Sequence, residues 1–447
     1  METAEQVLDA KASNQLAGDK EYIIAEVFNS GFAEAHDTYN AISVASDGNI
    51  YYILSSDKIN VGGKIYCYHT TSGRIEYLGD LTEICGEAQM NAISQGKSHV
   101  RFYEMNGKLF FSTHVGYYEL IDGMERMPVN APEGYQLYPG GHIISFDLQT
   151  RTFENLVIAP YGEGFVSMTM DVKRGQIFGI SWPQGYFLHY DVNRDVLKNI
   201  GKISHGGEAG TPGLDFRSLC RSLFVDRRDG TCYFSTAEGE IYAYNPVAGN
   251  IGLVSEVNLK LDYFGKYDYT RPGSMGYNWR KIFWYEKEQV AYGVHGNSGY
   301  LFRFDPDKKK AEIVDRITSA PSKASGMFDQ FSYGYLGFQL GPDKETIYYL
   351  TGGPIYVDGK RLKGANEIAK GGAKGLENLH LVTYHIPTNK YFDHGPIFYE
   401  DGQRPVYVNS IAVGHDGYIY TLARISTKEG TRTDLIRFKD PILQFSP

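Results

Sequence analysis

The chain has no hydrophobic run long enough to cross a membrane and no run of basic residues. No segment approaches the roughly 18–20 consecutive apolar residues of a spanning helix, and residues 1–20 lack the hydrophobic core of a signal peptide. The net charge is −9, whereas nucleic-acid binding depends on neutralising phosphates with basic side chains. We therefore expect no membrane span and no nucleic-acid partner. The net negative charge is still compatible with an anionic substrate, because an acidic protein can carry a small basic pocket.

Cysteine is scarce, and its spacing argues against a common metal motif. The four cysteines contain no CxxC pair, so a zinc ribbon is not expected. Cys220 and Cys232 flank a predicted hairpin, which makes them candidates for cross-strand neighbours. Since Cys often behaves as a small hydrophobe, the favoured interpretation is that the cysteines are buried free thiols.

Aromatic residues and glycine are abundant instead, and they follow a repeat. The chain holds 36 Tyr, 24 Phe and 51 Gly, a composition typical of strands and tight turns. A shared Gly followed by an alternating apolar strand recurs in one register, as GGKIYCYH from Gly62, GGHIISFD from Gly140, QGYFLHYD from Gln184, EGEIYAYN from Glu238 and SGYLFRFD from Ser298.

The first half of each repeat is a hairpin turn followed by a second alternating strand. It is read in SDGNIYYIL from Ser46, MNGKLFFST from Met105, RDGTCYFST from Arg228 and HDGYIYTLA from His415. With two altered turns, the repeats number seven, near residues 38–79, 93–156, 165–202, 219–256, 278–315, 332–394 and 406–438.

Strands of period two without intervening helices predict an all-β seven-bladed β-propeller with four-stranded antiparallel blades. Radial repetition protects the edges of such sheets. The last repeat shows three strands, so we expect Glu21–Phe28 to supply its fourth strand and close the ring. Residues 1–20 are then an N-terminal extension, and residues 21–447 form one catalytic domain. A Greek-key sandwich is the alternative, but it does not explain seven copies of one register.

The repeat alignment gathers polar side chains at one mouth of the channel. The innermost strands begin near Asn40, His99, Arg221, Arg280 and Asn409. The second strands end at His114 and His295, and the third strands begin at His142, Tyr186, Glu240 and Tyr300. For each His and Tyr, a structural role in hydrogen bonding or blade packing is the competing interpretation. A buried guanidinium needs an anion, either from the fold or from a substrate carboxylate.

Three insertions interrupt the regular spacing of the blades. They are the segments between His114 and His142, Leu261–Tyr277 and Gly353–Asn378, two of them rich in aromatic residues and the third in Gly and Lys. Long insertions on a rigid scaffold often carry binding functions. Their aromatic rings suit sugars, although they can also cap the blades.

The run KSHVRFYEMNGKLFFSTH followed by YPGGHIISFD resembles the β-propeller polysaccharide lyases, which include ulvan lyases and rhamnose–glucuronate lyases. QGYFLHYD and DGQRPVYVNSIAVGHDGYIY are similar to further features of that family. The resemblance implies β-elimination at a uronic acid, with two histidines, a tyrosine and an arginine around the carboxylate. By position, these catalytic residues are His114, His142, Tyr186 and Arg221.

The resemblance also suggests substrate contacts and shows two departures. Arg404 is a further implied substrate contact, and His99, Arg280, His295 and Tyr300 join it from the repeat alignment. The insert His205–Phe216 lengthens the spacing from Tyr186 to Arg221, so Arg217 or Lys202 can take the place of the arginine. The cysteine-rich zinc site of some ulvan lyases has no counterpart here.

We therefore expect an enzyme, a polysaccharide lyase that cleaves a linkage to a uronic acid, such as rhamnose–glucuronate, and leaves a 4,5-unsaturated uronate. Its partner is an anionic polysaccharide or oligosaccharide, and no cofactor is required, although a structural calcium ion with unidentified ligands is compatible. We expect a periplasmic or extracellular location with the signal removed from this chain; the cytoplasm is the alternative. Competing functions are a non-catalytic propeller that binds glycans or proteins and a metal-dependent lactonase-type propeller.

Overall fold

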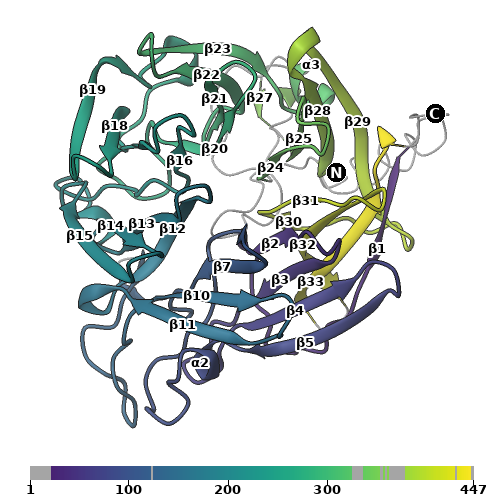
Figure 1. Ribbon diagram of the computed structural model, residues 1–447. Coiled ribbons are helices and arrows are strands. Elements are labelled where there is room, and N and C mark those ends of the chain that lie inside the picture. Colours follow the sequence, from purple (N-terminus) through teal and green to yellow (C-terminus); the bar gives the residue numbers. More distant parts are fainter. Residues whose placement is uncertain are drawn as a thin grey trace.

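The computed structural model describes residues 22–121, 124–324, 336–352, 356–357, 360–361, 378–427 and 430–443. Its strands form antiparallel sheets arranged in a ring (Figure 1). Five of these sheets are four-stranded blades, in which most neighbouring strands are joined by short hairpins. The all-β, bladed architecture expected from the repeats is confirmed.

The first three blades each have four strands. Blade one contains β2 (Ile42–Val44), β3 (Ile50–Leu54), β4 (Lys64–His69) and β5 (Arg74–Asp80). Blade two contains β6 (Tyr103–Met105), β7 (Lys108–Ser112), β10 (His142–Asp147) and β11 (Phe153–Ile158). Blade three contains β12 (Gly164–Asp171), β13 (Gln176–Trp182), β14 (Tyr186–Asp191) and β15 (Val196–Lys202).

Blades four to six repeat this order. Blade four contains β16 (Phe224–Val225), β17 (Cys232–Ser235), β18 (Glu240–Asn245) and β19 (Asn250–Asn258). Blade five contains β20 (Trp279–Tyr285), β21 (Val290–His295), β22 (Tyr300–Asp305) and β23 (Lys310–Arg316). Blade six contains β24 (Gly337–Leu340), β25 (Thr346–Thr351), β28 (His380–His385) and β29 (Lys390–Tyr399).

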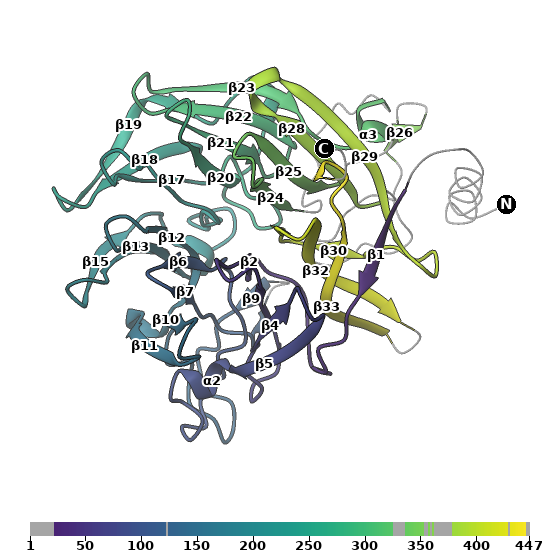
Figure 2. The ribbon, with the colours of Figure 1, turned by 45° about the vertical axis from the view of Figure 1, so that its right-hand side comes forward.

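The seventh blade is completed by the N-terminal strand. Its inner strands β30 (Tyr407–Val408) and β31 (Ala412–Val413) pair with β32 (Tyr418–Thr427), which pairs with β33 (Gly430–Lys439). Strand β1 (Ile23–Val27) then pairs antiparallel with β33, as expected. β1 also pairs in parallel with β29, so blades six and seven share one nine-stranded sheet (Figures 1 and 2).

The hydrophobic core lies between neighbouring blades. Alternating apolar side chains project from both faces of each blade, so adjacent blades bury one another. For example, Phe187 of blade three packs against Phe234 and Tyr244 of blade four, with ring centroids 5.2 and 5.0 Å apart. All four cysteines are buried free thiols within this packing, which confirms the favoured interpretation.

The shared Gly of the repeat has a steric reason in blades three, four and five. Gly185, Gly239 and Gly299 take φ angles of 79°, 90° and 67°, a region that favours glycine. A Cβ added at Gly185 would also lie 2.5 Å from Cδ2 of Leu219. The turn into the third strand therefore requires the residue on which the repeats align.

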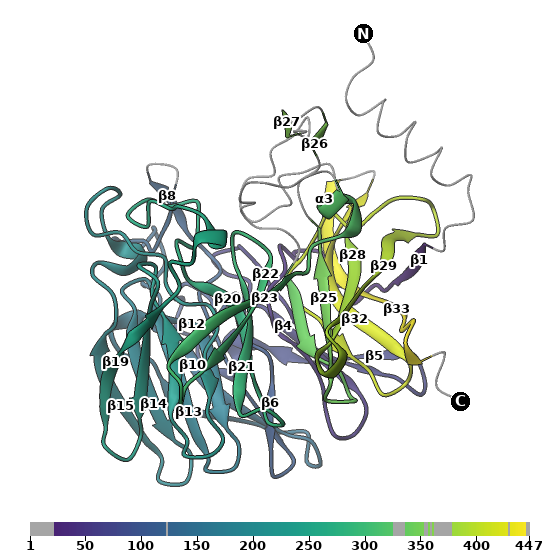
Figure 3. The ribbon, with the colours of Figure 1, turned by 90° about the horizontal axis from the view of Figure 1, so that it is seen from above.

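Several insertions rise from one rim of the ring. Figure 3 shows α3 (Ala320–Ala324), β8 (Glu119–Ile121), β26 (Tyr356–Val357) and β27 (Lys360–Arg361) on the same side. β8 pairs with β9 (Met124–Arg126), whereas most of Gly353–Asn378 lies outside the described residues. No helix among the described residues is long and apolar enough to span a membrane.

Candidate functional site

Five side chains from blades two and four gather where the inner strands begin. We call Lys97, His99, His114, Tyr118 and Arg221 the channel cluster. Lys97 and His114 exchange two backbone hydrogen bonds of 3.1 and 2.8 Å, which join the segment before β6 to the residues just after β7. The imidazoles of His99 and His114 lie 4.5 Å apart between ring centroids.

His114 is the most deeply buried member of the cluster. Its Nδ1–H donates to the Val115 carbonyl oxygen at 2.9 Å, an assignment that leaves Nε2 as the bare nitrogen. Nε2 has no hydrogen-bond partner among the described residues. Burial and the charge of Lys97 hold the pKa of His114 well below its usual range, so the ring is neutral at neutral pH.

His99 lies between two aromatic neighbours. Its ring is 4.6 Å from that of Tyr39 on one side, and His114 lies on the other. Burial and then the neighbouring His114 and Lys97 hold the pKa of His99 well below its usual value. Both histidines of the cluster are therefore neutral. Protonation of either imidazole requires an anion nearby to stabilise the imidazolium.

Lys97 and Tyr118 complete the wall beside these rings. The Lys97 ammonium donates to the Tyr39 hydroxyl at 2.9 Å and lies 4.3 and 4.4 Å from the ring centroids of Tyr39 and Tyr118. Tyr118 donates to the Val115 carbonyl oxygen at 3.1 Å. Burial raises the pKa of Tyr118 well above its usual value, so this phenol stays protonated.

Arg221 is oriented by Glu208, which comes from the insert between blades three and four. Arg221 Nη2 lies 2.6 Å from Glu208 Oε1. The same carboxylate accepts the Trp182 indole N–H at 2.8 Å and the Leu219 backbone N–H at 3.0 Å. Trp182 in turn contacts His114, with ring centroids 5.3 Å apart. Glu208 thus joins the arginine to the histidine side of the cluster.

Two further cations extend from blade five to the opposite side of the ring. Arg280 Nη2 donates to Asn409 Oδ1 of the seventh blade at 3.4 Å. Lys281 Nζ donates to Asn40 Oδ1 of the first blade. Burial, followed by the charges of Arg280 and Arg101, lowers the pKa of Lys281 well below its usual value. The inner strands therefore carry basic side chains into the interior of a protein of net charge −9.

His142 is not part of this cluster. Its ring nitrogens contact Glu87 Oε1 at 2.7 Å and Asn155 Oδ1 at 2.8 Å. The backbone places His142 opposite Thr113, on the strand face opposite to that of His114. The expectation that His114 and His142 flank one cavity is therefore corrected, because side chains alternate between the faces of a strand.

Tyr186 and Tyr300 lie farther out on their blades. Tyr186 contacts the ring of Tyr161 at 5.0 Å, with the Lys202 ammonium 5.5 Å from its centroid. Tyr300 lies under the Arg316 guanidinium, 4.6 Å from its ring. In the sheet of blade three, β14 is the third strand from the inner edge, and the grouping of Tyr186 with His114 stays a prediction.

The remaining candidates have partners within the fold. Arg217 pairs with Glu238 and donates to the Phe216 carbonyl oxygen at 2.7 Å. His295 contacts Ser298 Oγ at 2.9 Å and stacks on Phe264, and burial lowers its pKa to about 3. Arg404 is exposed and donates to Asn378 Oδ1 at 2.9 Å. Whether any of these residues contacts a substrate stays a prediction.

Sequence reasoning missed Lys97, Tyr118 and Glu208. Lys97 lies two residues before His99 in the KSH run, and that spacing on an extended inner strand was the available signal. Glu208 was hidden in the His205–Phe216 insert, whose fold no periodicity predicts. Tyr118 lies in the loop after β7, where its ring position depends on Trp182, 5.3 Å away between ring centroids.

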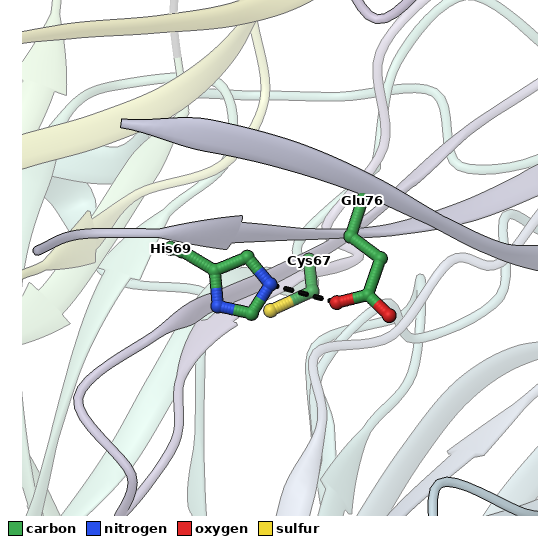
Figure 4. Close-up of side chains that lie close together, drawn as sticks. All are labelled: Cys67, His69 and Glu76. Atoms are coloured by element: carbon green, nitrogen blue, oxygen red, sulfur yellow. Dashed lines mark hydrogen bonds and ion pairs between the residues drawn. The ribbon is translucent and has the colours of Figure 1, made fainter. Parts of the chain in front are cut away.

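One group of three metal-ligating residue types occurs among the described residues, and it lies on blade one. Cys67, His69 and Glu76 bring their ligand atoms within 4.8 Å of one another (Figure 4). Arg151 donates to Glu76 at 2.8 Å and so already neutralises this carboxylate. Burial raises the pKa of Cys67 to about 11, which keeps it a thiol. The group also does not suit calcium, which takes oxygen ligands.

Comparisons with known proteins leave the family open. No family model matches the chain, and no curated protein matches it. Among solved structures, one described as "Crystal structure of Nidogen/Laminin Complex" is similar, with 9% sequence identity and a TM-score of 0.36. The match covers 66% of this chain and 79% of that chain. The resemblance to polysaccharide lyases therefore stays a prediction.

Proposed function

We propose that this propeller is a polysaccharide lyase that cleaves a linkage to a uronic acid by β-elimination at the channel cluster. The observation that carries the proposal is the bare Nε2 of His114, buried beside two cations. Such a nitrogen is a base that water does not protonate, placed where a carboxylate is attracted. His99, Tyr118, Lys97 and Arg221 supply the other groups that the reaction needs.

Removal of the C5 proton requires the uronate carboxylate to be neutralised. The positive charges of Lys97 and Arg221 act on both histidines, since each lowers the pKa of His99 and of His114. Hydrogen bonds and positive charge aimed at the carboxylate stabilise the enolate-like intermediate. A bound carboxylate also offsets these cations, which raises the pKa of His114 and makes it a stronger base.

His114 Nε2 accepts the C5 proton, and Tyr118 donates a proton to the departing glycosidic oxygen. The hydrogen bond from Nδ1–H to the Val115 carbonyl oxygen fixes the tautomer that leaves Nε2 free. Tyr118 suits the acid role because its raised pKa keeps the phenol protonated. The C4–O bond breaks as the C4–C5 double bond forms, so no water and no metal are consumed.

The test is incubation with a panel of uronate polysaccharides while following the ultraviolet band of a 4,5-unsaturated uronate. We expect product with the native chain and none with His114→Gln. His189→Gln is the matched control, because His189 of blade three is also a buried histidine, bonded to Gln176 of the same blade and to Tyr244 of blade four. Product from His114→Gln at the native rate would overturn the assignment of the base.

A non-catalytic propeller that binds anionic glycans is the second candidate. It is favoured by Lys281 and Arg280, because their hydrogen bonds to Asn40 and Asn409 hold basic side chains in the interior and binding there needs no proton transfer. Calorimetric binding of a uronate oligosaccharide without unsaturated product from any polymer would favour this candidate. Unsaturated product would exclude it.

A further inference from the structure

A pocket of about 350 Å³ lies between blades three and four, outside the channel cluster. One wall is the end of β15 and the residues that follow it, and the other is the turn between β17 and β18. Its lining residues are Lys202, Ile203, Ser204, His205, Thr236, Glu238, Glu240 and Tyr242.

Two hydroxyl groups in this lining lack hydrogen-bond partners among the described residues. They are the buried Oγ atoms of Ser204 and Thr236. Thr236 is only 5% exposed, so bulk solvent does not satisfy its hydroxyl readily. A buried hydroxyl without a partner is unfavourable, and a ligand that donates to it or accepts from it removes this cost.

The charges around the pocket are balanced. Glu238 pairs with Arg217, and His205 Nε2 lies 3.5 Å from the same carboxylate. Glu240 accepts the Tyr242 hydroxyl at 3.0 Å. With Lys202 as a further cation, the pocket offers both donors and acceptors and no excess positive charge. That chemistry suits a neutral sugar with several hydroxyls better than a carboxylate.

An aromatic pair continues the surface beyond Lys202. Lys202 lies over Tyr186, which packs against Tyr161. Tyr161 is 72% exposed and has a φ of 63°, a strained conformation for a tyrosine. Exposed aromatic rings held in a fixed position provide a flat face on which a sugar ring can stack.

The pocket and the channel cluster are linked by one loop. His205 lines the pocket, and Glu208, three residues later, orients Arg221. Three extended residues span at most about 11 Å, a separation that a short oligosaccharide can bridge. The two sites therefore lie within reach of one chain of sugars.

We infer that this pocket, with the Tyr161–Tyr186 pair, is a second carbohydrate subsite that takes a neutral, hydroxyl-rich sugar. The inference rests on the proposed function, since it places the neutral sugar next to the uronate bound at the channel cluster. The substrate class that fits both sites is a polymer in which uronic acid alternates with a neutral sugar.

The test is saturation-transfer NMR on the full chain, with rhamnose and glucuronate as separate probes. We expect transfer to rhamnose in the native protein and a weaker signal, through a two- to tenfold loss of affinity, in Thr236→Val. That range corresponds to about one hydrogen bond. Tyr161→Asn should also weaken the rhamnose signal, because it removes the exposed ring. Asn tolerates the left-handed backbone, so the substitution should not disturb the fold. Glucuronate signals should stay unchanged in both variants.

Two control variants separate this subsite from general effects. Thr318→Val removes another buried hydroxyl without a partner, and Tyr77→Asn removes an exposed ring on blade one. Both should keep the rhamnose signal. No transfer to rhamnose, or equal loss in a control and its paired variant, would overturn the inference. Rhamnose transfer without glucuronate transfer would uphold the pocket and count against the proposed function.

Discussion

Lys281 of blade five donates a hydrogen bond to Asn40 of blade one, on the other side of the ring. The two residues are 241 positions apart in sequence, and each lies where an inner strand begins. Because blades one and five are not neighbours, this contact crosses the channel. A lysine with an uncharged partner and a lowered pKa is an expensive group to bury, and it makes the interior sensitive to pH.

Removing Lys281 should change how stability depends on pH. The folded-state pKa of Lys281 lies below its unfolded value of about 10.4, so between these values the unfolded chain binds the extra proton. The Lys281 contribution to the free energy of unfolding therefore rises with pH in that window and is smallest at low pH. Chemical denaturation of the native chain and Lys281→Met at several pH values measures the difference. A difference that is constant with pH would contradict the lowered pKa.

The fall of kcat/KM at low pH should reflect protonation of His114. His114 has to be unprotonated to act as base, and its pKa is well below the usual value of about 6.5. Activity on a uronate polymer should therefore persist as the pH falls through 6.5 and decline only below it. Initial rates at low substrate concentration check this expectation. Half-loss of kcat/KM at or above pH 6.5 would assign the base to another group.

Glu208→Gln should affect protein stability and glucuronate binding in opposite directions. The change removes the charge that faces Arg221 and keeps an acceptor for only one of two donors, because Trp182 and Leu219 bond to different oxygens of the carboxylate. We expect a loss of about 1–3 kcal/mol in unfolding free energy, since a partly buried cation loses its charged partner. Binding of glucuronate should strengthen, because the Glu208 charge no longer competes with the glucuronate carboxylate for Arg221. Denaturant melts and calorimetry measure both effects, and weaker glucuronate binding would show that Glu208 orients Arg221 more than it competes for it.

Closure of the ring by β1 predicts that substitutions at two adjacent residues lower the free energy of unfolding by very different amounts. Ala25 is 1% exposed between β29 and β33, whereas Ile24 is 39% exposed. Ala25→Asp buries a carboxylate and should lower the free energy of unfolding by several kcal/mol, about 3 or more. Ile24→Asp should cost less than about 1 kcal/mol. Equal losses in denaturant melts would mean that β1 does not close the seventh blade in solution.

The repeat register was sufficient to predict the blades because it reflects local chemistry. Turns such as Asp47–Gly48 and the shared Gly at positions such as Gly239 follow from backbone conformation. The number of strands also predicted that Glu21–Phe28 completes the last blade, since the last repeat shows three strands and would leave an unpaired edge. The turns and the shared Gly depend on neighbours in sequence, whereas the closing strand was inferred from the number of strands in the last repeat and pairs with residues far along the chain.

The membership of the candidate site was decided by tertiary structure. The register brought His99 and Arg221 to the start of inner strands and His114 to the end of a second strand, but it did not show which face of a strand each side chain occupies. His142 therefore looked equivalent to His114 until its contact with Glu87 placed it on the other face. The sequence determined the seven blades and the rim at which polar residues gather. Packing between blades decided that Lys97, Tyr118 and Glu208 surround the histidines. Those contacts join loops, and no local sequence pattern fixes the conformation of these loops.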